Sequence, residues 1–201
     1  MAAIRSICVY CGSSPGKNSA FIAKARAFGR IMADSGIALV YGGGSTGLMG
    51  AVAGGVSENG GTVIGVIPEF LRARELAFKS AAEMIVTRDM HERKQIMFDR
   101  ADAFVAFPGG IGTLEELVEQ LTWSQLGRHK KPILLADIGG FWRPLIELLD
   151  HMANTGFIHS ASTFEYLIAN AVEDIVPALQ AAAASVSESE REGDRSSLRK
   201  L

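Results

Sequence analysis

The stretch that decides the fold runs from residue 103 to residue 116 and reads AFVAFPGGIGTLEE. Ala103–Phe107 is a short apolar run of the kind that forms a buried strand. A glycine-rich turn follows at Pro108–Gly112, and the segment that begins at Thr113 places its apolar residues at helical spacing. The order is therefore strand, glycine loop and helix. The backbone amides in the first turn of such a helix favour an anion, and phosphate is the commonest one.

The rest of the chain repeats this alternation of short apolar runs and longer helical patterns, which indicates a parallel sheet with helices on both faces. The expected strands are Ser6–Tyr10, Ala38–Tyr41, Thr62–Ile67, Glu83–Val86, Ala103–Phe107 and Pro132–Ala136, with a further strand around Thr163–Ile168. The expected helices are Ser19–Ser35, Gly47–Asn59, Asp89–Arg100, Thr113–Leu126, Phe141–Thr155 and Ala171–Ala184. We therefore predict one α/β domain with a doubly wound, mostly parallel, Rossmann-like sheet, and a site above the carboxyl ends of the strands.

Residues 185–201 differ from the rest, because they are rich in charged residues and serine and poor in apolar ones. Such a segment cannot bury enough apolar surface to order itself. The composition predicts a folded domain over residues 1–184, followed by a flexible polar tail over residues 185–201.

The composition also limits the partners. With 201 residues, of which 48% are hydrophobic, the chain can bury a sizeable core as one domain. A formal net charge of −2 gives no basic surface for nucleic acid. No apolar run approaches the ~18 residues that a membrane-spanning helix needs, and the first six residues lack the layout of a signal peptide. We expect a cytoplasmic protein that binds neither membranes nor nucleic acid.

The two cysteines, Cys8 and Cys11, have the Cys-x-x-Cys spacing of redox and zinc sites. They lie at the end of the first expected strand, where residues three apart point to opposite faces. A thioredoxin-like pair begins a helix, and a structural zinc site needs two more ligands, whereas the four histidines show no ligand spacing. We predict one buried cysteine, one loop thiol and no metal.

Residues 42–47 contain the pattern Gly-x-Gly-x-x-Gly between an expected strand and an expected helix. A dinucleotide-binding fingerprint follows the first strand, whereas this loop follows the second. The acidic residue after the next strand is Glu69, and its place behind Pro68 suits a ribose contact poorly. The loop is better suited to pack a helix closely on the sheet or to line a mononucleotide site. Its candidate ligand contacts are Gly43 and Gly44, together with Gly12 and Ser13 from the loop after the first strand.

Two consecutive cations, Arg93 and Lys94, fall between two methionines of an apolar helical stripe, where core residues are expected. The helix begins with Asp89 as its N-cap. A buried charge is costly without a partner, so a ligand phosphate or a protein carboxylate should meet these cations. Alternatively, their side chains reach solvent or pair with Glu92 or Asp99.

Glu116 has two interpretations. Thr113 and Glu116 have the spacing of a capping box, in which Glu116 reaches back to the amide of Thr113. Glu116 can instead act as a carboxylate at the mouth of the anion site. Capping and catalysis could share the residue, but not at the same moment.

The helix that begins at Thr113 has an unusual outer face. Its expected buried stripe consists of Leu114, Leu117, Val118 and Leu121. Glu116, Glu119 and Trp123 fall on the opposite face by the 3.6-residue period. A tryptophan on a face expected in water suggests a lid, a ligand or a second subunit.

The chain resembles the LOG ("Lonely Guy") family of cytokinin riboside 5'-monophosphate phosphoribohydrolases. The likeness rests first on Met-His-Glu-Arg-Lys at residues 90–94 and on Pro-Gly-Gly-x-Gly-Thr-x-x-Glu at residues 108–116. It extends through residues 7–14, 41–50 and 122–127, in the family's order and approximate spacing, and it covers the chain up to about residue 180.

The resemblance implies hydrolysis of the N-glycosidic bond in an N6-modified adenosine 5'-monophosphate, or in AMP itself, to the free base and ribose 5-phosphate. It assigns the catalytic roles to Arg93 and Glu116. The substrate contacts that it implies are Glu75, Lys94, Gly110, Ile111, Gly112, Thr113, Leu114, Glu115 and Thr122. It implies no metal or redox cofactor, and a homodimer whose active sites lie near the subunit contact.

Two other classes remain open. A protein of this fold can bind or carry a nucleotide without hydrolysing it, although the presence of both Arg93 and Glu116 argues against that. Lysine decarboxylation is a label often attached to this family, and it requires a lysine that holds pyridoxal phosphate. The sequence shows no motif for such a site.

Overall fold

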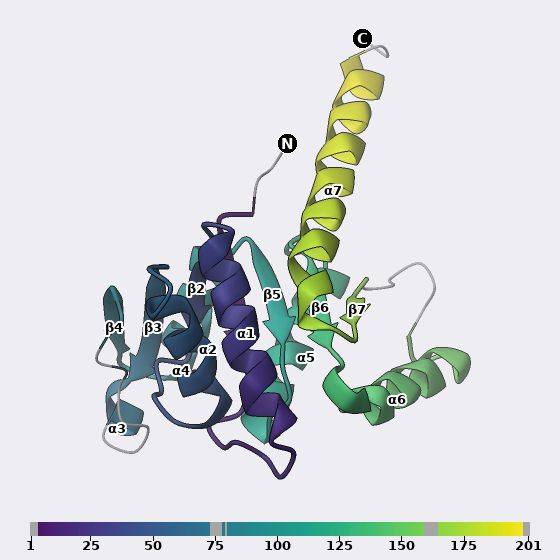
Figure 1. Ribbon diagram of the computed structural model, residues 1–201. Coiled ribbons are helices and arrows are strands. Elements are labelled where there is room, and N and C mark those ends of the chain that lie inside the picture. The colour runs from purple at the N-terminus through teal and green to yellow at the C-terminus, as the bar shows by residue number, and fades with distance from the viewer. Residues whose placement is uncertain (1–3, 73–77, 79, 159–164, 199–201) are drawn as a thin grey trace.

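The structure is a computed structural model that describes residues 4–72, 78, 80–158 and 165–198, with side chains described as far as Val186. One sheet of seven parallel strands has the order β4-β3-β2-β1-β5-β6-β7 (Figure 1). The strands are β1 Ser6–Tyr10, β2 Ala38–Tyr41, β3 Val63–Pro68, β4 Glu83–Thr87, β5 Ala103–Ala106, β6 Ile133–Ala136 and β7 Leu167–Ala169. The predicted single α/β domain with a doubly wound parallel sheet is confirmed.

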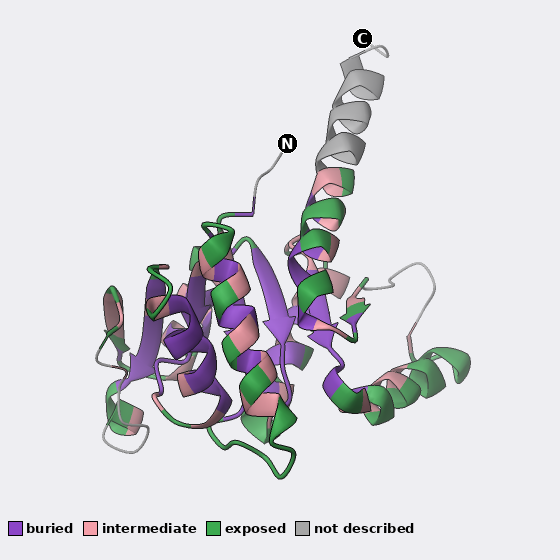
Figure 2. Cartoon of the chain, viewed as in Figure 1, coloured by how far each residue is buried: buried purple, intermediate pink, exposed green. Residues whose placement is uncertain are grey.

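Helices cover both faces of the sheet. They are α1 Ala20–Asp34, α2 Gly47–Ser57, α3 Glu69–Arg72, α4 Met90–Arg100, α5 Ile111–Gln125, α6 Arg143–Asn154 and α7 Ile175–Leu198, with short 3-10 turns η1 Ile138–Gly140 and η3 Val172–Asp174. Residues of α1, α2 and α7 form one hydrophobic cluster with the sheet, and residues of α4 and α5 form another on its opposite face. The central strands are buried on both sides, as Figure 2 shows, which explains their continuous apolar runs.

The helices α1 and α2 cross at very close range. A Cβ atom on Gly29 of α1 would lie 2.2 Å from the carbonyl oxygen of Val52, and one on Gly55 of α2 would lie 2.2 Å from the carbonyl oxygen of Arg26. Only glycine allows the two backbones to approach so closely. This close crossing depends on glycines inside the two helices, whereas Gly47, the last glycine of the loop before α2, lies against the loop after β1: a Cβ atom there would lie 2.4 Å from the carbonyl oxygen of Ser13.

The order of the strands in the sheet determines where the site lies. β1 and β5 are neighbours in the sheet, yet the helices that follow them, α1 and α5, lie on opposite faces. Their loops diverge above the carboxyl ends of the two strands, and a crevice at such a switch point is where ligands bind in this class of fold. The two loops are joined by a hydrogen bond from the Gly12 amide to the Pro108 carbonyl oxygen, at 3.1 Å.

Two predicted helix boundaries are wrong. The helix α5 begins at Ile111 rather than Thr113, and α7 continues to Leu198 rather than ending at Ala184. Residues 185–198 are therefore helical: they include glutamate, arginine and leucine, which are good helix formers, and they extend the alanine-rich helix that precedes them. The division into a domain over residues 1–184 and a tail over residues 185–201 stays a prediction.

The structure tests two further expectations only for the residues that it describes. The start of the strand predicted over Thr163–Ile168 lies outside them, and β7 occupies Leu167–Ala169. Among the helices described, none is long and apolar enough to cross a membrane.

Candidate active site

A cavity of about 310 Å³ opens above the carboxyl ends of β1 and β2, between α4 and the start of α5. Its volume is at the lower end of the range for small-molecule sites. The cavity is lined by Val9, Cys11, Gly12, Ser13, Gly42, Met49, Met90, Arg93, Gly110, Ile111, Gly112, Thr113, Glu115 and Glu116. Segments that are far apart in the sequence thus meet at the predicted edge of the sheet.

Most of the predicted site residues gather in this cavity. Those that line it are Gly12, Ser13, Arg93, Gly110, Ile111, Gly112, Thr113, Glu115 and Glu116. Those that do not are Gly43, Gly44, Lys94, Leu114 and Thr122. Glu75 lies outside the described residues. Sequence reasoning missed Val9, Cys11, Gly42, Met49 and Met90 as residues that line the cavity. Val9, Met49 and Met90 fit the apolar pattern of the core and carry no separate signal.

The amino end of α5 forms one wall of the cavity. Gly110 is the N-cap and has extended backbone angles, and no acidic side chain lies in the first turn. The amides of Ile111, Gly112 and Thr113 have no acceptor within the helix, as in any first turn. Together with the helix dipole they provide the partial positive charge that an anion requires.

The capping-box interpretation of Glu116 is wrong. Thr113 lies inside the helix and is buried, so it is not the N-cap, and Glu116 stands three residues too far along to close a box on Gly110. The Glu116 carboxylate instead faces Arg93, with Oε1 3.6 Å from Nη2, and the two side chains are 10% and 8% exposed. The geometry therefore supports a role for Glu116 in the site.

The predicted buried face of α5 is also wrong in part. The buried residues are Thr113, Glu116, Leu117, Gln120 and Leu121. Val118, which was predicted to be in the core, is 42% exposed. The helix is rotated so that Thr113, Glu116 and Gln120 face inward, which brings Glu116 against Arg93 of α4.

Trp123 is only half-buried, but its own chain covers much of it. Its ring packs edge-on against Phe98 of α4, with 5.1 Å between the ring centroids. The guanidinium of Arg128 lies 3.7 Å from the centroid of the Trp123 ring. Trp123 therefore lies on the side of α5 that faces α4, as Glu116 does, and because its own chain covers it there it gives no separate argument for a second subunit.

Arg93 is a buried cation whose hydrogen-bonding capacity is not used up. Its distance of 3.6 Å to Glu116 is too long for a hydrogen bond, and its Nε has no hydrogen-bond partner among the described residues. Nη1 makes a weak contact of 3.7 Å to the sulfur of Met90. A Cβ atom on Gly42 would lie 2.2 Å from Nη2, so the glycine leaves the room that the guanidinium needs.

Lys94 lies beside Arg93 but not in the cavity wall. Its Nζ donates to Oε1 of Glu115 at 2.5 Å and to Oε1 of Glu119 at 2.9 Å. Burial opposes the charge of Lys94, but the hydrogen bonds to the two carboxylates outweigh burial and raise its pKa. The prediction that anions meet both cations is confirmed. The alternative partners are wrong, because Glu92 pairs with Arg88 and Asp99 accepts from Gln95.

The end of β1 carries three groups that burial keeps neutral, of which Cys11 lines the cavity and Cys8 and Tyr10 do not. Cys8 and Cys11 are free and buried, on opposite faces of the sheet as predicted, although Cys11 is not an accessible loop thiol. Burial, together with the charge of Glu116, raises the pKa of both thiols well above the ordinary range. Burial likewise raises the pKa of Tyr10. In the part of the chain that the structure describes, no group of three or more His, Cys, Asp or Glu side chains is arranged to hold a metal.

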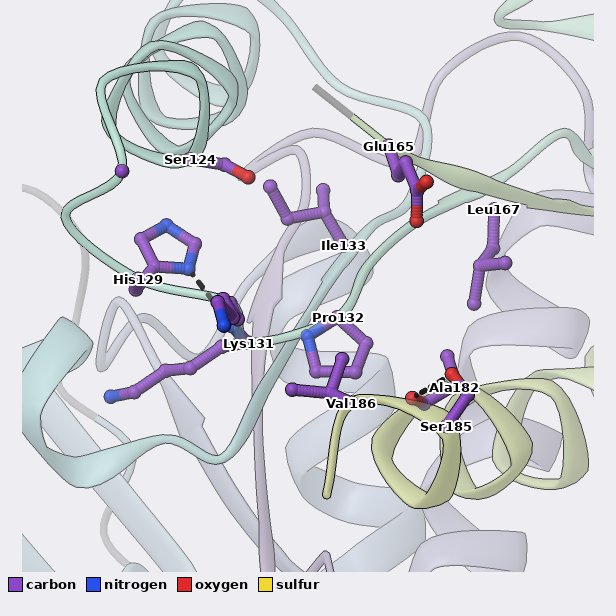
Figure 3. Close-up of a pocket in the computed structure, with 12 residues that line it drawn as sticks. Ser124, His129, Lys131, Pro132, Ile133, Glu165, Leu167, Ala182, Ser185 and Val186 are labelled. Atoms are coloured by element: carbon purple, nitrogen blue, oxygen red, sulfur yellow. Dashed lines mark hydrogen bonds between the residues drawn. The ribbon is translucent and has the colours of Figure 1, made fainter. Parts of the chain in front are cut away.

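A second cavity, of about 320 Å³, lies at the amino ends of β6 and β7, beside α7 (Figure 3). Its polar residues are largely engaged with the protein itself. His129 Nδ1 accepts a hydrogen bond from the amide of Lys131, and Lys131 Nζ points away and donates to the carbonyl oxygen of Phe98 at 2.7 Å. Glu165 and Lys130 are exposed. This cavity holds no buried ion pair among its described residues.

The fold and the first cavity define a class of Rossmann-like proteins that place a buried arginine–glutamate pair beside an anion site at the start of a helix. A family model described as "Possible lysine decarboxylase" matches residues 49–179. A cytokinin riboside 5'-monophosphate phosphoribohydrolase of Rhodococcoides fascians is 42% identical over 177 residues, which are 88% of this chain and 89% of that protein. The chain therefore belongs to the LOG family.

Plant proteins and solved structures agree with this assignment. The LOG protein of Oryza sativa subsp. japonica, which carries the same enzyme name, is 49% identical over 154 residues, which are 77% of this chain and 64% of that protein. A molybdenum cofactor carrier protein from Chlamydomonas reinhardtii has a TM-score of 0.68 and 25% identity, over 90% of this chain and 99% of that one. A molybdenum cofactor binding protein from Rippkaea orientalis has a TM-score of 0.65 at 21% identity, over 90% of this chain and 98% of that one, and it shows the fold alone.

Proposed function

We propose that this protein hydrolyses the N-glycosidic bond of cytokinin riboside 5'-monophosphates, which are N6-modified adenosine 5'-monophosphates, and releases the free base and ribose 5-phosphate. The observation that carries the proposal is the burial of Arg93 and Glu116 together, in a cavity that also receives the amino end of α5. Relatives that are 42% and 49% identical bear the name of this activity.

The proposed mechanism begins with the phosphate. The amides of residues 110–113 bind the 5'-phosphate, and the ribose then lies over Glu116. Departure of the base gives the ribose oxocarbenium character, which the Glu116 carboxylate stabilises while it orients or activates a water molecule. Arg93 holds Glu116 in place or polarises the substrate, because its guanidinium retains donors that no described residue uses.

The proposal includes a homodimer. Ile111, Val118 and Leu126 on α5 are 82%, 42% and 76% exposed, and apolar side chains in these positions favour burial against another surface. Thr122 lies on this exposed side of α5, outside the cavity of its own chain. The substrate contact that the family resemblance implies for Thr122 therefore requires a neighbouring subunit.

The dimer is tested by Leu126→Glu, which puts a charge into the proposed interface. We expect the wild type to sediment as a dimer at micromolar concentration and the variant to sediment as a monomer with weaker activity. Phe70→Glu on α3, at another exposed apolar residue, serves as the control. A monomeric wild type would contradict the dimer and leave the hydrolase proposal standing.

The competing function is that of a carrier, which the structural likeness to the molybdenum cofactor carrier favours. The hydrolase is better supported, since its relatives are closer in sequence and both residues of the arginine–glutamate pair are present. Lysine decarboxylation has less support, because none of the described residues that line the cavity is a lysine. The two free buried cysteines are in keeping with the reducing cytoplasm, where we place the reaction.

The deciding experiment incubates the purified protein with isopentenyladenosine 5'-monophosphate and, separately, with AMP. We expect release of free base together with an equal amount of ribose 5-phosphate, both identified by chromatography and mass. Binding of either nucleotide without product would favour the carrier. The ratio of the two rates establishes whether the N6 substituent is required.

A further inference from the structure

The interface between α4 and α5 contains five charged side chains in two adjacent ion-pair groups. In the first group Arg93 faces Glu116, and in the second Lys94 binds both Glu115 and Glu119. Two consecutive cations of α4 therefore meet three carboxylates of α5. Lys94 therefore offsets the charge of two carboxylates that lie on the same helix as Glu116.

The contacts of Lys94 separate it from the substrate. Its side chain is 11% exposed, and its ammonium already binds two carboxylates at 2.5 and 2.9 Å. Lys94 is absent from the lining of the cavity, whereas Arg93, the residue before it, belongs to that lining. An ammonium that already donates to two protein carboxylates, outside the lining of the cavity, is poorly placed to bind a phosphate as well.

We propose that Lys94 is a positioning residue: it holds Glu115 and Glu119 away from Arg93 and offsets their charge, so that Arg93 stays directed at Glu116 and the cavity. This inference rests on the proposed hydrolase function. It replaces the direct substrate contact that the family resemblance implies for Lys94.

The charged and titratable groups around Glu116 determine whether the proposed role of Lys94 can be measured from the pH dependence of the reaction. From β1, the groups that face Glu116 are Cys8, Tyr10 and Cys11, whose pKa values burial raises, so that they stay neutral. From α4 come Arg93 and Lys94, and from α5 come Glu115 and Glu119. The charge that Glu116 experiences is therefore set by residues of α4 and α5 that can each be substituted.

The test uses two substitutions that we expect to shift the pH profile of kcat/KM in opposite directions. Glu116 must be ionised in the proposed mechanism, so kcat/KM rises with pH through the pKa of Glu116. Lys94→Met removes a positive charge nearby, and we expect the acidic limb of the kcat/KM profile to move up by about one pH unit. We also expect kcat to fall about tenfold or more, with a smaller change in KM.

Glu119→Gln removes a negative charge, so the acidic limb should move down. The double variant Lys94→Met/Glu119→Gln should return the limb toward the wild-type position and recover most of kcat. Arg100→Met is the matched control, because Arg100 lies on the same helix and pairs with Glu83, outside the cavity. It should leave both kcat/KM and the position of the limb unchanged.

Three results would overturn the inference. A rise in KM without movement of the limb, not rescued by Glu119→Gln, would make Lys94 a substrate contact. A lower melting temperature with an unmoved limb would make Lys94 purely structural. If the Lys94→Met variant does not fold, Glu119→Gln is the test. An acidic limb of its kcat/KM profile that stays at the wild-type position would contradict the positioning role of Lys94. Absence of base release by the wild type would instead refute the proposed function itself, and with it this role.

Discussion

Two cavities of the molecule are nearly equal in volume, about 310 Å³ above the carboxyl ends of the strands and about 320 Å³ at the amino ends. They differ in how their charges are held. The first contains Arg93 and Glu116, both buried and 3.6 Å apart, whereas the charged side chains of the second are exposed or engaged by backbone atoms, as with Lys131. Volume therefore does not identify the active site, but buried charge with unused hydrogen-bonding capacity does.

The largest expected effect is the loss of the Glu116 charge. Glu116→Gln should keep the fold and the phosphate site but lose most turnover, because the charge that stabilises the oxocarbenium is gone. A loss of about 2–4 kcal/mol in transition-state stabilisation is the scale for one such group. The measurement is kcat/KM for isopentenyladenosine 5'-monophosphate. Activity within a few-fold of the wild type would contradict the conclusion that the first cavity, with its buried Glu116, is the active site.

The second effect concerns the amino end of α5. Nucleoside 5'-monophosphates should be cleaved about 100-fold or more faster than the matching nucleosides, because binding of the remote phosphate holds the ribose in place for reaction. Comparison of kcat/KM for AMP and for adenosine measures this. Equal rates would mean that the first cavity does not use its helix amides for an anion.

A smaller loss is expected from Gly42→Ala. Its new Cβ atom would lie 2.2 Å from the end of the Arg93 side chain, which can move aside, so the fold should persist while the guanidinium is displaced. Misplacement of a catalytic group by about 1 Å can cost up to about 100-fold, and we expect a loss of 10-fold or more in kcat. Gly54→Ala on α2, where the nearest atom is 3.5 Å away, is the control and should leave kcat unchanged. Equal activity of the two variants would show that the position of Arg93 is not critical.

The smallest effect belongs to the second cavity. Burial lowers the pKa of His129, so its neutral form is favoured in the fold. The stability that this group contributes is present above its ordinary pKa of about 6.5 and is lost as the pH falls through the lower folded value. His129→Gln should weaken the decrease in melting temperature between neutral and acidic pH by a small amount, and it should leave kcat unchanged. A loss of turnover would link the second cavity to catalysis.

The sequence predicts the sheet and the buried cations well, but not the inner face of α5. Six of the apolar runs become strands within one residue, because strands covered on both faces are continuously hydrophobic, whereas the run predicted over Thr163–Ile168 gives β7 at Leu167–Ala169. Arg93 and Lys94 are identifiable because charges interrupt an apolar stripe, and a buried charge requires an anion.

The misses on α5 have two causes. A prediction from hydrophobic spacing assumes that polar residues face solvent. In α5, however, Thr113, Glu116 and Gln120 are buried. Glycine is a poor helix former, so the sequence places the helix start at Thr113, although the backbone of residues 111 and 112 is already helical. The contacts of α4 with α5 join residues about 20 positions apart. Local spacing therefore cannot show which face of α5 they bury.

The course of α7 has a practical consequence. This helix runs past the amino ends of the strands and continues away from the sheet, on the side opposite to the cavity that holds Arg93 and Glu116 (Figure 1). A reporter protein or a solid support joined beyond α7 would therefore stand clear of the entrance for nucleotides. Attachment at that end should give an immobilised catalyst that works at the rate of the free protein, and the fold suits a biosensor that measures cytokinin nucleotides through the ribose 5-phosphate released.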